Sequence, residues 1–102
     1  MTLEPESVMI TDAAGTQLWY VTGRLHRTDG PALIWANGTQ LWYVTGRLHR
    51  TDGPAVIWAN GHQEWWVRGQ NLTKEIISWM QQRDIKWPWS ESAQVEFVLT
   101  WS

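Results

Sequence analysis

The sequence predicts a mainly β protein of the α+β class, in which an antiparallel sheet of about six strands is built from repeated β-hairpins and closed by a C-terminal helical cap. Two observations predict this fold. The phrase GTQLWYVTGRLHRTDGPALIWAN occupies residues 15–37 and recurs at residues 38–60 with one change, Leu33 against Val56. An Asn-Gly pair follows each copy of the apolar run LIWA or VIWA, and such pairs are the strongest short-range signal for a hairpin.

A repeat of this length is typical of a supersecondary unit that stacks on its neighbours, because one hairpin cannot bury its own faces. A degraded third copy begins as GHQEWWVRG at residues 61–69. Beyond it the pattern changes. We therefore place the repeat sheet in residues 1–70 and the cap in residues 71–102.

Composition limits the classes of function. The 102 residues include ten tryptophans and no cysteine, so a disulfide framework and a thiolate metal site are excluded. The formal charge is −2 and no basic stripe is visible, which argues against binding nucleic acid through phosphate contacts. The N-terminus lacks the pattern of a secretory signal, and no apolar run reaches the roughly 20 residues of a membrane span. We expect a soluble cytoplasmic protein with no membrane partner.

The turns predict the strands. Asn37-Gly38 and Asn60-Gly61 are expected to form two-residue type I′ turns, with a weaker example at Ala14-Gly15. The intervening segments 22–32 and 45–55 contain Gly, Asp and Pro and are predicted to be tight connections. Six antiparallel strands are expected, near residues 7–13, 16–22, 32–36, 39–45, 55–59 and 62–68.

A two-residue turn at Asn37-Gly38 also predicts the register of the strands. It would place Ile34 opposite Leu41 and Leu33 opposite Trp42. Both faces of such a sheet would be apolar. The tryptophan-rich face is expected to form the core beneath the C-terminal helix, with Trp19, Trp35, Trp42, Trp58 and Trp65.

The last third of the chain predicts a helix over residues 74–83, with Thr73 as its N-cap. Ile76 and Trp79 would lie on its inner face. The WPW sequence ends this helix. Residues 90–101 are ambiguous: Ser90 with Glu91 is typical of a helix start, whereas the later apolar residues alternate as in a strand. We expect a short helix followed by an extended end.

The repeat resembles a known family. Each unit closes with Asn-Gly, and the first copy carries Trp19, Gly23, His26 and Gly30 at the spacing of the MORN repeat. The variant WYVTGRLHRTDGPA is similar to MORN-like repeats of bacteriophage and giant-virus proteins. The resemblance covers about residues 8–70 and departs in having RTDGPA where the usual motif has a Gly-x-Gly pair. It implies a twisted hairpin array, a binding or scaffolding role and a phage or mobile-element origin. It transfers no catalytic residue.

Candidate site residues are sought first among the titratable groups. His26 with Asp29, and His49 with Asp52, lack a neighbouring nucleophile or a metal-ligand spacing, so a structural role in the loops is favoured. We predict no enzymatic activity, no metal and no cofactor.

Aromatic residues on the opposite face are the better candidates, because large rigid aromatics recur at protein interfaces. The predicted partner-binding residues are the aromatic row with the loop arginines: Tyr20, Tyr43, Trp66, Arg24, Arg27, Arg47 and Arg50.

The predicted function is that of a small, non-catalytic, tryptophan-rich repeat protein that binds a host protein, as a phage-encoded inhibitor of a defence or housekeeping factor. Two alternatives remain open at this point. A nucleotide-sequestering protein would hold a small nucleotide ligand with the aromatics and Arg27 or Arg50. A structural scaffold would assemble into a homo-oligomer. Nucleic acid is not an expected partner.

Overall fold

The computed structural model describes residues 7–102, so residues 1–6 of the predicted repeat region lie outside it. Eleven short strands precede two helices, α1 (Thr73–Arg83) and α2 (Glu91–Trp101). The strands are β1 (Val8–Thr11), β2 (Gln17–Val21), β3 (Arg24–Leu25), β4 (Leu33–Ile34), β5 (Gln40–Leu41), β6 (Tyr43–Val44), β7 (Arg47–Leu48), β8 (Val56–Ile57), β9 (Gln63–Glu64), β10 (Trp66–Val67) and β11 (Gln70–Asn71).

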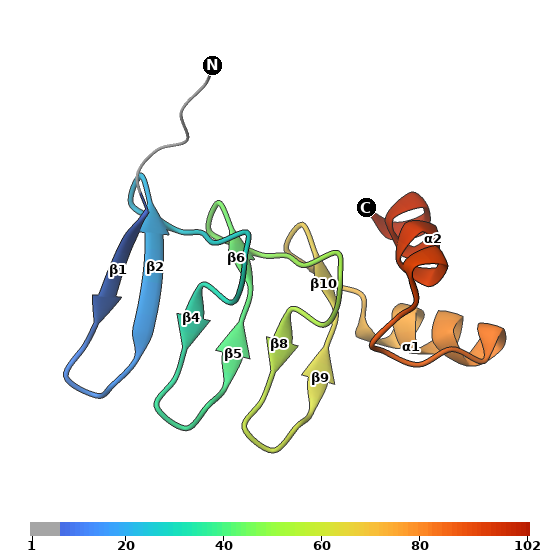
Figure 1. Ribbon diagram of the computed structural model, residues 1–102, viewed down its shortest axis with the longest axis horizontal. Coiled ribbons are helices and arrows are strands. Elements are labelled where there is room, and N and C mark those ends of the chain that lie inside the picture. Colours follow the sequence, from blue (N-terminus) through green and yellow to red (C-terminus); the bar gives the residue numbers. More distant parts are fainter. Residues whose placement is uncertain (1–6) are drawn as a thin grey trace.

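The strands form a row of antiparallel hairpins with both helices at one end (Figure 1). The main sheet has the order β1-β2-β4-β5-β8-β9, and β3 pairs with β2 at its side. Two small sheets, β6-β7 and β10-β11, repeat the β2-β3 pairing in the next two units. The predicted fold class, a hairpin-repeat sheet with a C-terminal helical cap, is confirmed.

The Asn-Gly turn is longer than predicted. The N–H of Gly38 donates to the carbonyl of Trp35 at 2.9 Å, and the N–H of Trp35 donates to the carbonyl of Thr39 at 2.9 Å. Only Gly38 has positive φ, at 93°, whereas a type I′ turn needs it at Asn37 too. This is a type I turn closed by a left-handed glycine. The Asn37 side chain accepts the N–H of Thr39, which favours this longer loop.

The register therefore differs from the prediction by one residue. Leu33 lies opposite Leu41, and Ile34 lies opposite Gln40. Trp42 separates β5 from β6; its N–H donates to the carbonyl of Ala55 at 2.8 Å, and its carbonyl accepts the N–H of His49 at 3.0 Å. A shift of one residue exchanges the faces of a strand, so the predicted division of the apolar residues between two faces was wrong.

The two-residue turns lie instead at the Thr-Gly and Arg-Gly pairs. Positive φ occurs at both positions of Thr22-Gly23 (48° and 77°), Thr45-Gly46 (51° and 77°) and Arg68-Gly69 (50° and 78°). These turns close β2-β3, β6-β7 and β10-β11. The two predicted tight connections, residues 22–32 and 45–55, thus each begin at the turn of a second hairpin. One repeat therefore contains two hairpins.

Neighbouring repeats are joined by the same bonds each time. The N–H of Thr45 donates to Nδ1 of His26 at 3.0 Å, and the N–H of Gly46 donates to the carbonyl of Leu25 at 2.8 Å. One repeat later, His49 Nδ1 accepts the N–H of Arg68 at 2.9 Å. The left-handed turns at Thr45-Gly46 and Arg68-Gly69 are therefore each held by the histidine of the unit before them.

The main apolar cluster forms only where the last repeat meets the cap: Trp65, Val67, Ile76, Trp79, Met80 and Phe97. The prediction that all five tryptophans of one face lie beneath the helix was wrong. Trp65 is buried, whereas Trp19 and Trp42 are half-buried and Trp35 is 38% exposed. The cap touches one end of the row, so it covers only the last tryptophan of the series.

The helices depart from the prediction at their ends. Helix α1 begins at Thr73, but Leu72 is its N-cap residue and no side chain caps it. The hydroxyl of Thr73 instead accepts the N–H of Trp65 at 3.1 Å. Helix α2 continues to Trp101, so the expected extended end was wrong. Ser90 caps it by accepting the N–H of Ala93 at 3.2 Å.

Candidate functional site

The loops at residues 27–31 and 50–54 each hold an arginine in the same way. The guanidinium of Arg27 lies 4.1 Å from the ring centre of Trp19. Its Nε donates to Asp29 at 2.9 Å, and its Nη1 donates to the carbonyl of Pro31 at 3.1 Å. A guanidinium packed on an aromatic ring and bound to a carboxylate has little freedom to reach a distant partner.

Arg50 repeats this arrangement. It lies 3.9 Å from the ring centre of Trp42, with its Nε 2.7 Å from Asp52 and its Nη1 2.9 Å from the carbonyl of Pro54. The side chain is only 14% exposed, against 25% for Arg27. These two predicted partner-binding arginines therefore organise their own loops.

Three other arginines form a row along the two-residue turns, which we call the arginine ridge: Arg24, Arg47 and Arg68. All three are exposed. A Cβ built on Gly46 would lie 3.8 Å from the side chain of Arg24, and one on Gly69 would lie 3.4 Å from Arg47, so each arginine lies against the next turn. Within residues 7–102, no carboxylate forms a salt bridge with any of the three.

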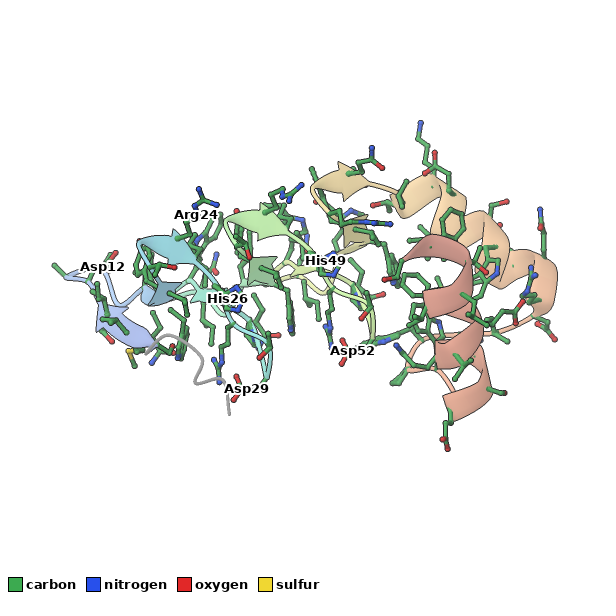
Figure 2. The ribbon with its side chains drawn as sticks, turned by 90° about the horizontal axis from the view of Figure 1, so that it is seen from above. Asp12, Arg24, His26, Asp29, His49 and Asp52 are labelled. Carbon is green, nitrogen blue, oxygen red and sulfur yellow. The ribbon has the colours of Figure 1, made fainter. Side chains whose placement is uncertain are left out.

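The ridge gives the molecule two chemically different edges. Figure 2 shows Arg24 on the opposite side of the row from Asp29 and Asp52. The repeat interval brings Arg24 and Arg47 together, and both were predicted as partner-binding residues. Arg68 was missed because it replaces the threonine of the turn rather than the arginine that follows it. Its place one turn further along the row could be found only from the structure.

The predicted aromatic row lies in the strands that lead into these turns. Tyr20 is in β2, Tyr43 in β6 and Trp66 in β10, and all three are half-buried. The indole N–H of Trp66 is used within the protein, because it donates to Glu64 at 3.0 Å. Whether this row meets a partner stays a prediction.

Glu64 has a role that the sequence did not suggest. It stands where the other two repeats have leucine, at Leu18 and Leu41. Its carboxylate accepts the indole N–H of Trp58 at 2.7 Å and also the indole N–H of Trp66. Two indole donors satisfy a charged group in a position that is apolar in the other repeats.

The titratable groups of the loops have simple environments. The hydrogen bond from Arg27, with its charge, lowers the pKa of Asp29. Burial lowers the pKa of His49, and the charges of Arg68 and Arg47 lower it further. Nδ1 of His49 accepts a backbone N–H, which requires an unprotonated nitrogen at that position.

The described residues form no cluster of three metal-ligating side chains. Among the same residues, neither helix has the length and apolar character that crossing a membrane requires. Comparisons with protein-family models, curated proteins and solved structures gave no match to this chain. The resemblance to the MORN repeat therefore stays a prediction.

Proposed function

We propose that this protein is a non-catalytic binding protein whose arginine ridge recognises an acidic surface on a partner protein. The observation that carries the proposal is the row of exposed guanidinium groups of Arg24, Arg47 and Arg68, which lie on successive turns without a carboxylate partner in residues 7–102. Such a row concentrates positive potential at one edge of a chain whose formal charge is −2.

The backbone of the ridge supports this proposal. Two of the three turns are held by hydrogen bonds to the preceding repeat: Thr45-Gly46 through His26 and Leu25, and Arg68-Gly69 through His49 and Leu48. Binding then costs little ordering of the main chain, and only the side chains lose freedom. Arginine also suits the role, because its planar guanidinium can donate two parallel hydrogen bonds to one carboxylate.

The aromatic row is the second part of the proposed surface. Tyr20, Tyr43 and Trp66 lie in the strands that enter the three turns. Half-buried aromatic side chains next to arginines are the composition found at protein interfaces. A phage-encoded inhibitor of a host protein would use such a surface, and this origin remains part of the proposal.

The test is a capture experiment with the tagged protein in bacterial lysate, read by mass spectrometry at 0.05 and 0.5 M NaCl. The double variant Arg24→Gln/Arg47→Gln should lose the captured protein, and high salt should release it from the wild type, because exposed charges are screened over about 8 Å at physiological salt. A fluorescent oligo-glutamate peptide should likewise bind the wild type more tightly than the double variant, and more tightly at 0.05 M than at 0.5 M NaCl.

The matched control is Lys74→Gln/Lys86→Gln, which removes the same charge from exposed positions in and beside the cap. It should retain the captured protein. Capture that the ridge variant and salt leave unchanged would contradict the proposal, as would an oligo-glutamate peptide that binds both double variants equally.

A further inference from the structure

The two loops of identical sequence RTDGP have different neighbours. Loop 50–54 is covered by the cap: the indole Nε1 of Trp87 donates to the carbonyl of Asp52 at 3.0 Å, and Nε2 of Gln94 donates to the carbonyl of Thr51 at 2.6 Å. The cap thus shows what this loop binds when a neighbour is present.

The guanidinium of Arg50 lies between two tryptophans. Its carbon is 3.9 Å from the ring centre of Trp42 and 5.5 Å from that of Trp87. Within the described part of the chain, Arg27 packs on Trp19 alone, at 4.1 Å from its ring centre. One face of Arg27 therefore lacks the aromatic contact that its counterpart makes.

The glycines of the two loops show the same difference. A Cβ on Gly53 would lie 2.7 Å from Nε1 of Trp87, so the indole occupies the space that the missing side chain leaves. At Gly30 the three atoms nearest to such a Cβ all belong to the guanidinium end of Arg27, the nearest at 3.0 Å. Among residues 7–102, no ring atom is one of the three atoms nearest to that position.

The carbonyl groups of Thr28 and Asp29 correspond to the two acceptors of the second loop. Within residues 7–102, neither accepts a hydrogen bond. A cavity of about 600 Å³ lies between the two loops and is lined by residues that include Thr28, Asp29, Gly30, Trp42 and Arg50. Figure 2 shows Asp29 and Asp52 on the side of the row where both loops lie.

We propose that this cavity binds a tryptophan side chain carried by an exposed segment of a partner protein. The indole N–H donates to the carbonyl of Asp29, and the ring packs beside Gly30 on the free face of Arg27, as Trp87 does on the second loop. A lysine would meet two arginines, and phenylalanine has no donor, so the site selects an aromatic ring with an N–H. It lies on the edge opposite the arginine ridge and does not depend on the function proposed above.

The probe is the fluorescein-labelled peptide DIKWPWSES, the protein's own residues 84–92, titrated with the full chain and followed by fluorescence polarisation. Saturable binding is expected. The same peptide with Trp87→Phe should bind about fivefold more weakly, the effect of one lost hydrogen bond worth about 1 kcal/mol. Chemical shifts in ¹⁵N-labelled protein should move at Thr28, Asp29 and Gly30.

The decisive variant is Gly30→Ala. The backbone of Gly30 is not in the left-handed region, and the atoms nearest to the added methyl belong to the guanidinium of Arg27, at 3.0 to 3.2 Å. A shift of that guanidinium by a few tenths of an ångström accommodates the methyl, so the protein should fold with an unchanged circular dichroism spectrum. The methyl fills the space of the indole and should reduce binding at least tenfold. Arg24→Gln, on the other edge, should bind the peptide normally.

Three results would overturn the proposal: no binding of the peptide up to 1 mM, equal binding of the tryptophan and phenylalanine peptides, or equal binding by folded Gly30→Ala. The last result would mean that the peptide displaces the cap at the second loop. None of these results bears on the arginine ridge, which is tested with lysate and oligo-glutamate.

Discussion

The two ends of the hairpin row are built from the same residues yet differ in burial. Val21, Val44 and Val67 occupy equivalent positions in three successive units, but only Val67 is buried, at 2% exposed. Trp19, Trp42 and Trp65 follow the same order, and again only the last is buried. At the far end, all four residues of β1 are exposed. Burial here depends on the distance from the cap rather than on residue type.

The difference in burial predicts how stability is distributed along the row. In a stacked repeat, each unit contacts only its neighbours, so stability is approximately a sum of local contributions. The unit next to the cap shares a cluster of aromatic and aliphatic side chains with both helices. The first unit relies on hydrogen bonds and half-buried side chains. We therefore expect the N-terminal end to open at a lower free energy than the C-terminal end.

The largest expected effect comes from removing the same two methyl groups at the two ends. Val67→Ala should lower the free energy of unfolding by about 2 kcal/mol, because it leaves a cavity in the main cluster. Val21→Ala, at the half-buried equivalent position, should cost less than about 1 kcal/mol. Urea denaturation followed by circular dichroism measures both. Equal losses would show that burial next to the cap does not determine stability.

A smaller difference is expected between the two loop arginines. Arg50→Ala and Arg27→Ala remove the same carboxylate and carbonyl contacts, but Arg50 also packs on Trp87. The Arg50 variant should be less stable than the Arg27 variant by about 0.5–1 kcal/mol, the usual size of one partly exposed cation–π contact. Thermal denaturation of the two variants side by side provides the measurement. The reverse order would contradict the assignment of Trp87 to the second loop.

The smallest expected effect is a pH dependence at the joint between the second and third units. Burial and the charges of Arg68 and Arg47 lower the pKa of His49 in the folded state, so the unfolded chain binds the proton more readily. The stability that neutral His49 contributes to the fold is complete above about pH 6.5, the ordinary pKa of histidine, and is lost as the pH falls below that value. The urea midpoint should therefore fall between pH 7.5 and pH 5.

Two substitutions isolate this effect. His49→Asn keeps a side-chain acceptor for the N–H of Arg68 and should reduce the pH dependence. His62→Asn changes an exposed histidine in a hairpin turn and should leave it as in the wild type. A pH dependence that both variants retain would assign it to other groups.

The repeat, its hairpins and the cap could all be predicted from the sequence, because period and turn residues are local signals. Asn37-Gly38 was correctly placed in a turn, and the helix predicted over residues 74–83 is α1 (Thr73–Arg83). The type of turn could not be predicted. Glycine tolerates positive φ both in a two-residue turn and in the longer turn that the structure has at Gly38. The structure places the two-residue turns at Thr22 and Thr45, where a non-glycine residue adopts positive φ.

Stacking holds the second and third of these two-residue turns. At Thr45 the preceding repeat supplies His26 as an acceptor for the backbone N–H, and such a bond depends on a residue 19 positions away. The arginine ridge and the cavity between the loops have the same origin, because each joins residues one repeat apart. Residue types and spacing determined that this chain folds into a capped row of hairpins. Only the tertiary structure decided the register, which tryptophan is buried, and which arginines face solvent, because these properties arise from contacts between repeats.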